Sequence, residues 1–111
     1  MLSDTISKIE AKLSRLVGTG SGVNEQTRAE LLQLIGELKR EIATVDEEQA
    51  LNITGFTRES TEHATGEAPN PELLKRSLAE LAASVDGFEK SHPGLVQVVN
   101  RICTTLSNIG I

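Results

Sequence analysis

The chain has 111 residues, 38% of them hydrophobic, and its aromatic residues are limited to Phe56 and Phe88. This length allows one domain, over residues 1–111, and its mix of Leu, Ile, Val and Ala suits the contacts between packed helices. The net charge of −5 argues against a general nucleic-acid binder and against attachment to anionic lipid, because both functions need a basic surface.

A short helix over about residues 3–17 is the first predicted element. Ser3 and Asp4 can cap its start, and its apolar residues recur every three or four positions, at Leu2, Ile6, Ile9, Leu13 and Leu16. Three glycines then fall within residues 18–23. Because glycine loses the most backbone entropy on joining a helix, residues 18–23 are expected to form a linker.

A long helix over about residues 24–65 comes next, with Asn24 as its N-cap. Its apolar row runs in steps of four and three through Leu31, Ile35, Leu38, Ile42 and Val45. Beyond Val45 the row continues only with a four-residue insertion near Gln49, and several poor helix formers follow: Asn52, Thr54, Gly55 and Thr57. We predict one continuous helix. The alternative is a break near Asp46, which would then cap a new helix.

Residues 66–69 carry a clear turn signal, and Asn70 and Pro71 mark the start of a last helix over about residues 70–108. Its apolar row keeps the same steps, with His92 as the one polar occupant, through Leu74, Leu78, Leu81, Val85, Phe88, Leu95, Val99, Ile102, Leu106 and Ile109. A repeat of this length is typical of a helix that packs lengthwise on other helices.

A kink is predicted in this last helix at Ser91, His92 and Pro93. Proline is tolerated in the first turn of a restarted helix, where its missing N–H costs nothing. We expect His92 to hydrogen-bond a backbone carbonyl at the kink. Because the apolar row keeps its phase across Pro93, we predict two nearly collinear halves rather than a reversal of the chain.

The predicted fold is all-α: a short N-terminal helix plus a long antiparallel helical hairpin of the coiled-coil type, since a short connection makes neighbouring helices antiparallel. At 1.5 Å per residue, each arm of the hairpin would be on the order of 60 Å long. The half nearest the turn would then contain two helices only, which would leave apolar side chains facing water. We therefore expect a homo-oligomer, most simply a C2 dimer, with an interface formed by Leu51, Phe56, Leu74, Leu78, Leu81, Val85 and Phe88.

No catalytic or cofactor-binding motif is present in the sequence, but one pair of residues has a metal-ligand spacing. Glu89 and His92 form a Glu-x-x-His pair, which di-metal bundles use twice, together with further glutamates. A dimer would supply two pairs, and the predicted hairpin places Glu47 and Glu48 at about the level of Glu89. A metal-binding bundle, either enzyme or sensor, is therefore the alternative to our leading hypothesis. That hypothesis is a non-enzymatic, self-associating interaction or scaffold protein that binds an unidentified partner.

His63 is expected to be a partly exposed hydrogen-bonding residue and Cys103 a buried structural cysteine. A single cysteine excludes an intrachain disulfide and fits a reducing compartment. No apolar run approaches the roughly 20 residues of a membrane span, and the first residues lack the features of a signal peptide. We expect a cytoplasmic protein.

Two C-terminal segments carry a family resemblance: residues 88–93 (F-E-K-S-H-P) and residues 106–111 (L-S-N-I-G-I). They resemble an uncharacterised domain-of-unknown-function family of short bacterial helical proteins, which share an F-E-x-S-H-P segment and an S-N-x-G-I terminus. Residues 61–64 (T-E-H-A) match less well, since T-H-E-A is commoner there. The resemblance covers most of the chain from about residue 28. It implies a small bacterial cytoplasmic helical protein and carries no assigned activity.

Overall fold

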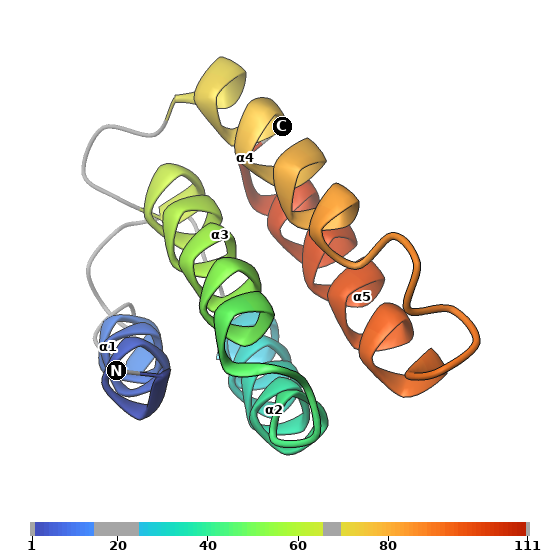
Figure 1. The fold of residues 1–111 in the computed structure, drawn as a ribbon. Coiled ribbons are helices and arrows are strands. Elements are labelled where there is room, and N and C mark those ends of the chain that lie inside the picture. Colours follow the sequence, from blue (N-terminus) through green and yellow to red (C-terminus); the bar gives the residue numbers. More distant parts are fainter. Residues whose placement is uncertain (1, 15–24, 66–69, 111) are drawn as a thin grey trace.

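The computed structural model describes residues 2–14, 25–65 and 70–110, and the regular structure in these ranges is entirely helical. The all-α prediction is therefore confirmed (Figure 1). The helices of the described ranges are α1 (Leu2–Ser14), α2 (Glu25–Ile42), α3 (Glu47–Thr65), α4 (Pro71–Ser84) and α5 (Pro93–Gly110). The predicted linker at residues 18–23 and the turn at residues 66–69 lie outside the described residues.

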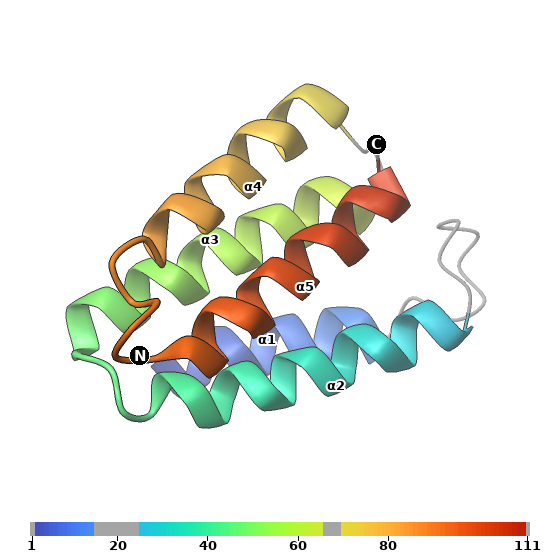
Figure 2. The same cartoon turned by 90° about the vertical axis from the view of Figure 1, so that its right-hand side faces the viewer.

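Successive helices run in opposite directions, so that α1, α3 and α5 point one way and α2 and α4 the other (Figure 2). α1 packs on α2 and α3, and α5 also packs on α2 and α3, so these four helices surround a common core. α4 packs on α3 and α5 from outside this bundle. The molecule measures 39 × 25 × 23 Å, which is shorter than the arms predicted from the sequence.

The apolar rows found in the sequence form the core. α2 buries one side of its surface, and α1 and α5 bury rows of the same kind. The fully or nearly fully buried side chains of these three helices are Ile6, Ile9, Leu13, Leu31, Leu34, Ile35, Leu38, Ile42, Leu95, Val98, Val99, Ile102 and Leu106. Spacing in steps of three and four places each row on one side of its helix, and burial of these rows supplies the main driving force for folding.

The prediction of one continuous helix over residues 24–65 is wrong, and the alternative break near Asp46 is correct. The N–H of Val45 donates to the carbonyl of Ile42 (3.1 Å), three residues back, so α2 ends in a tightened turn. The carbonyl of Asp46 then accepts the first bond of α3 from the N–H of Ala50 (2.8 Å). Breaking here lets α3 fold back and bury its own row against the bundle, which a straight continuation could not do.

The two halves of the predicted last helix are not collinear either. Residues 85–92 connect α4 to α5 and reverse the chain, so α5 packs antiparallel on α4 (Figure 2). The reversal includes Gly87, whose φ of 96° is a conformation that residues with a side chain rarely adopt. The apolar row keeps its phase across the reversal because both helices turn that row toward the same core. Pro93 begins α5, as predicted.

The hairpin predicted around residues 66–69 is present as the antiparallel pair α3 and α4 (Figure 2), with arms shortened by the two breaks. Asn70 caps α4 as predicted, since its Oδ1 accepts the N–H of Leu73 (3.1 Å). The N–H of Asn70 also donates to the carbonyl of His63 (3.3 Å), which joins the end of α3 to the start of α4.

α3 contains several residues that form helices poorly, and it contacts α1, α4 and α5. Its buried side chains are mostly small or hydroxylated: Ala50, Ile53, Thr54, Thr57, Ser60, Thr61, Ala64 and Thr65. Each threonine hydroxyl donates to the carbonyl four residues earlier, at 2.6 to 3.0 Å. These bonds satisfy the hydroxyls without any partner from another helix. Small side chains then let three helices approach α3 closely.

Candidate interaction site

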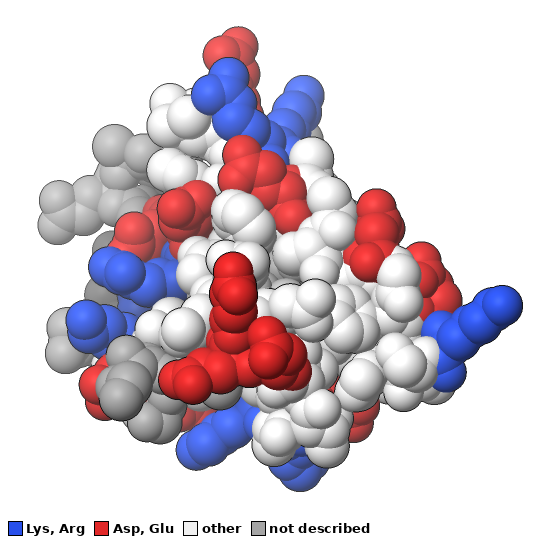
Figure 3. All heavy atoms as spheres, in the orientation of Figure 1, with Lys and Arg blue, Asp and Glu red and all other residues white. Residues whose placement is uncertain are grey.

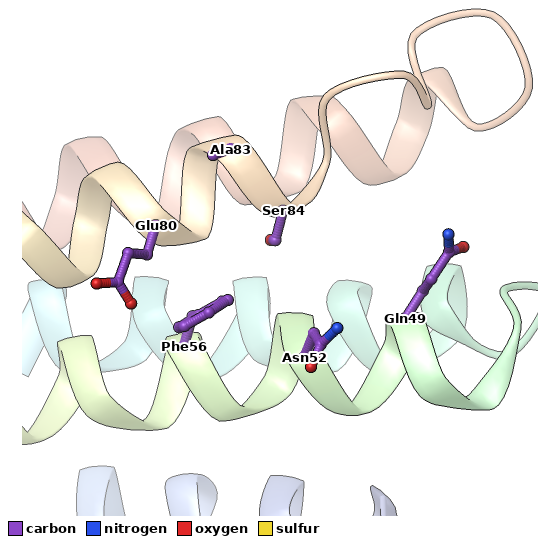
Figure 4. Close-up of a pocket in the computed structure, with 6 residues that line it drawn as sticks. All are labelled: Gln49, Asn52, Phe56, Glu80, Ala83 and Ser84. Carbon is purple, nitrogen blue, oxygen red and sulfur yellow. The ribbon is translucent and has the colours of Figure 1, made fainter.

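An open groove lies between α3 and α4. It has a volume of about 390 Å³ and is lined by Gln49, Asn52 and Phe56 from α3 and by Glu80, Ala83 and Ser84 from α4 (Figure 4). The side chains of Gln49 and Phe56 point toward α4, while those of Glu80 and Ser84 point toward α3. The antiparallel pairing of the two helices therefore brings together residues 24 to 35 positions apart in the sequence.

The lining of the groove offers groups for recognition. The Phe56 ring is half-buried, and the carboxylate of Glu80 is exposed. The ion pairs recorded among the described residues, Arg28 with Glu25 and Arg58 with Glu62, do not involve Glu80. The Ser84 hydroxyl donates to the carbonyl of Leu81 (2.6 Å) and is thereby occupied. The groove thus combines an apolar ring, an acceptor carboxylate and two side-chain amides.

The surface around the groove carries charges of both signs. On the face shown in Figure 3, lysine and arginine side chains lie around the edge, acidic ones lie between them and at the centre, and the basic groups form no continuous patch. Leu51 and Leu73 are the large hydrophobic side chains recorded as exposed among the described residues, at 38% and 39%. Each lies in the first turns of its helix, α3 or α4, so the antiparallel pairing puts the two leucines at opposite ends of the hairpin.

A family model described as "Domain of unknown function (DUF4404)" matches residues 2–111. The chain belongs to the DUF4404 family. The expected membership of an uncharacterised family is confirmed and extends over nearly the whole chain. No curated protein and no solved structure matches this DUF4404 chain. Arguments about its function therefore start from its own residues.

The interface residues predicted from the sequence fall into two groups in the DUF4404 structure. Leu74, Leu78, Leu81 and Val85 are buried inside the chain. The prediction that the region near the turn has two helices only is wrong, because α5 folds back over it and covers this row. Those four side chains are therefore not available to a second copy. Leu51 is exposed, and Phe56 and Phe88 are half-buried, so these three keep accessible surface. Apart from Phe56, the sequence did not point to the lining of the groove, because most of that lining lies beside the apolar rows rather than on them.

The predicted kink residues form the entry to α5. The N–H of His92 donates to the carbonyl of Phe88 (2.7 Å), and the carbonyl of His92 accepts from the N–H groups of Leu95 (3.1 Å) and Val96 (3.3 Å). The His92 ring packs edge-on against the Phe88 ring, with centroids 5.4 Å apart, and its Nδ1 lies 2.9 Å from Ser91 Oγ. The side-chain partner is thus a hydroxyl rather than the expected backbone carbonyl. His92 shapes the start of α5.

The metal-ligand candidates do not come together within one chain. The carboxylate of Glu89 accepts the N–H of Gly87 (2.7 Å), while Glu47 and Glu48 are exposed in the first turn of α3. Among the described residues, no three His, Cys, Asp or Glu side chains are grouped closely enough to hold a metal ion. The metal hypothesis drew its ligands from two copies of the chain, and it stays a prediction.

The remaining reactive side chains lie outside the groove. His63 is half-buried at the end of α3. Cys103 is a free, half-buried thiol whose Sγ donates to the carbonyl of Leu78 (3.8 Å). Burial raises the pKa of the Cys103 thiol to about 11, so it is protonated and weakly nucleophilic at neutral pH. Within the described ranges, no helix combines the length and apolarity needed to cross a membrane.

Proposed function

We propose that this DUF4404 protein is a non-enzymatic helical interaction protein that self-associates, most simply as a C2 dimer, through the side of the molecule formed by α3 and α4. The groove between these helices is the observation that carries the proposal. Its half-buried Phe56 ring keeps apolar surface accessible, and aromatic rings of this kind are common anchors of protein interfaces.

The chemistry of the lining favours recognition over catalysis. A carboxylate, two amides and an aromatic ring can bind and orient a protein surface. The two histidines and the thiol lie elsewhere, on the end of α3, at the start of α5 and within α5. The Cys103 thiol, whose pKa burial raises, is suited to packing rather than to nucleophilic attack.

A cytoplasmic location in a bacterial cell is part of the proposal. A free thiol packed against a backbone carbonyl fits a reducing compartment. The dimer would act as a scaffold that leaves the α1 and α2 side of the molecule open to an unidentified protein partner.

Sedimentation equilibrium of the full chain at micromolar concentrations tests the proposal. The chain has a mass of 11.9 kDa, and we expect the measured mass to rise with concentration to twice that value. A mass that stays at one chain throughout the micromolar range would contradict it. Phe56→Ala should weaken the association at least tenfold. His92→Ala, in the connection between α4 and α5 and outside the groove, should leave the association unchanged.

A further inference from the structure

The outer side of α4 carries a row of exposed residues that the bundle does not use. Leu73, Arg76, Glu80 and Ala83 follow one another in steps of three, four and three, so they share one side of the helix. All four side chains are exposed, and Leu73 retains 39% of its surface. The inward row of the same helix, which includes Leu74 and the residues four and seven positions on, is buried against α3 and α5.

We propose that this exposed row, Leu73–Arg76–Glu80–Ala83, is the surface on which two copies of the chain pair, with their α4 helices antiparallel about a two-fold axis. The inference rests on the proposed self-association and names its contact. In an antiparallel pair, residues equally far from the axis on either side face each other. Positions 73 and 83 are symmetric about position 78, and so are positions 76 and 80. One register therefore places Leu73 opposite Ala83 of the second copy and Arg76 opposite Glu80 of the second copy.

This pairing places a large side chain opposite a small one and a positive charge opposite a negative one. Leu73 is the largest exposed apolar side chain of α4, and Ala83 is the small residue of the row. Ala83 also lines the groove between α3 and α4, so Leu73 of one copy enters the groove of the other, beside Phe56. Neither Arg76 nor Glu80 belongs to the ion pairs recorded within the described residues.

Two-fold symmetry makes each of these contacts occur twice. The dimer contains two leucines seated in grooves and two arginine–glutamate pairs, all made by one patch on each copy, as an isologous interface requires. Ala79, exposed on the same outer surface of α4, is small enough to let the two helices approach. A parallel pairing would instead place Arg76 opposite Arg76 and Glu80 opposite Glu80, so the charges favour the antiparallel arrangement.

Charge exchange between two variants tests the pairing. The R76E chain carries two carboxylates in the row and the E80R chain carries two guanidinium groups, so each variant alone meets only like charges across the axis. We expect each to dimerise at least tenfold more weakly than the unchanged chain. Mixed in equal amounts, the two variants should form a 1:1 complex, because every cross-axis pair is then of opposite sign. Sedimentation of the mixture, with one chain fluorescently labelled, measures this.

The controls separate this contact from self-association in general. K75E makes the same change of charge on a neighbouring exposed residue of α4 outside the row, and it should dimerise like the unchanged chain. Circular dichroism should show equal helix content in all variants. A monomeric unchanged chain would overturn both proposals. A dimeric unchanged chain whose R76E and E80R variants dimerise equally well, or fail to combine when mixed, would overturn this contact alone. Capture of a different protein by the row, with no dimer formed, would also overturn it.

Discussion

The two sides of this molecule reach the same degree of burial with different kinds of side chain. α2 and α5 fill the core with Leu, Ile and Val, whereas α3 buries Ala, Thr and Ser together with one isoleucine, Ile53. Large apolar side chains remove more surface from water and so stabilise the fold more. Small ones stabilise less but let neighbouring helices approach more closely, as at α3, which packs on α1, α4 and α5. The candidate interaction site lies between α3, which buries small residues, and α4, which buries mainly leucines.

The largest expected effect comes from the side of the molecule with large side chains. Leu38 on α2 is fully buried. Leu38→Ala should lower the free energy of unfolding by about 2–5 kcal/mol, because it removes buried methyl groups and leaves a cavity. Urea denaturation followed by circular dichroism measures this. Leu51→Ala, at a position that is 38% exposed, is the matched control and should change stability by no more than about 0.5 kcal/mol. Equal effects at the two positions would contradict the assignment of the core.

The side with small residues should respond in the opposite way to side-chain size. Thr57 is fully buried, and its hydroxyl donates to the carbonyl of Ile53 (2.7 Å). Thr57→Leu should cost about 1–3 kcal/mol, because the larger side chain forces the packed helices apart. Thr57→Val keeps the size and loses only the hydroxyl, whose acceptor is already bonded within the helix, so we expect a change of about 1 kcal/mol at most. If Thr57→Leu were stabilising, α3 would not be closely packed.

The sequence predicted the helical class, the buried rows, the start of α4 and the start of α5, because these depend on local spacing and on capping residues. It did not predict the reversal at residues 85–92, and it gave the break near Asp46 only as the alternative. Apolar spacing shows which side of a helix is buried, but two helices that turn the same row toward one core keep the same phase as one straight helix. The row therefore continues through residues 85–92 although the chain changes direction there.

The reversal between α4 and α5 brings α5 back against α4, and Gly87 is the residue to change in order to test it. A Cβ at position 87 would meet no atom within 4 Å, so the cost of a side chain there comes from the φ of 96° alone. Gly87→Ala should lower stability by about 1–2 kcal/mol. Gly55→Ala, inside α3 with equally open space, should raise stability by about 0.5–1 kcal/mol. Thermal or urea unfolding of the pair checks the sign. A stabilising Gly87→Ala would mean that this glycine does not adopt a positive φ in solution.

The groove was missed for a related reason. The sequence predicts Phe56 as an interface residue, but Glu80 and Ala83 lie outside the apolar row and have no signal of their own in it. Their arrangement depends on which side of α4 remains exposed once α3 and α5 have covered the others. An exposed row can be found only after the packing of its helix is known.

The smallest expected effect concerns Ser60, where α3 departs from its own pattern. Its hydroxyl is buried without a hydrogen-bond partner, whereas the buried threonines of the helix each donate to a carbonyl. Ser60→Ala removes an unsatisfied polar group and adds a better helix former, so we expect a gain of about 1 kcal/mol in the free energy of unfolding. Thr61→Ala removes a bonded hydroxyl (2.8 Å) and a methyl group, and should cost about 1 kcal/mol instead. If Ser60→Ala were as destabilising as Thr61→Ala, the Ser60 hydroxyl would also be bonded in solution, and the buried hydroxyls of α3 would all contribute to its stability in the same way.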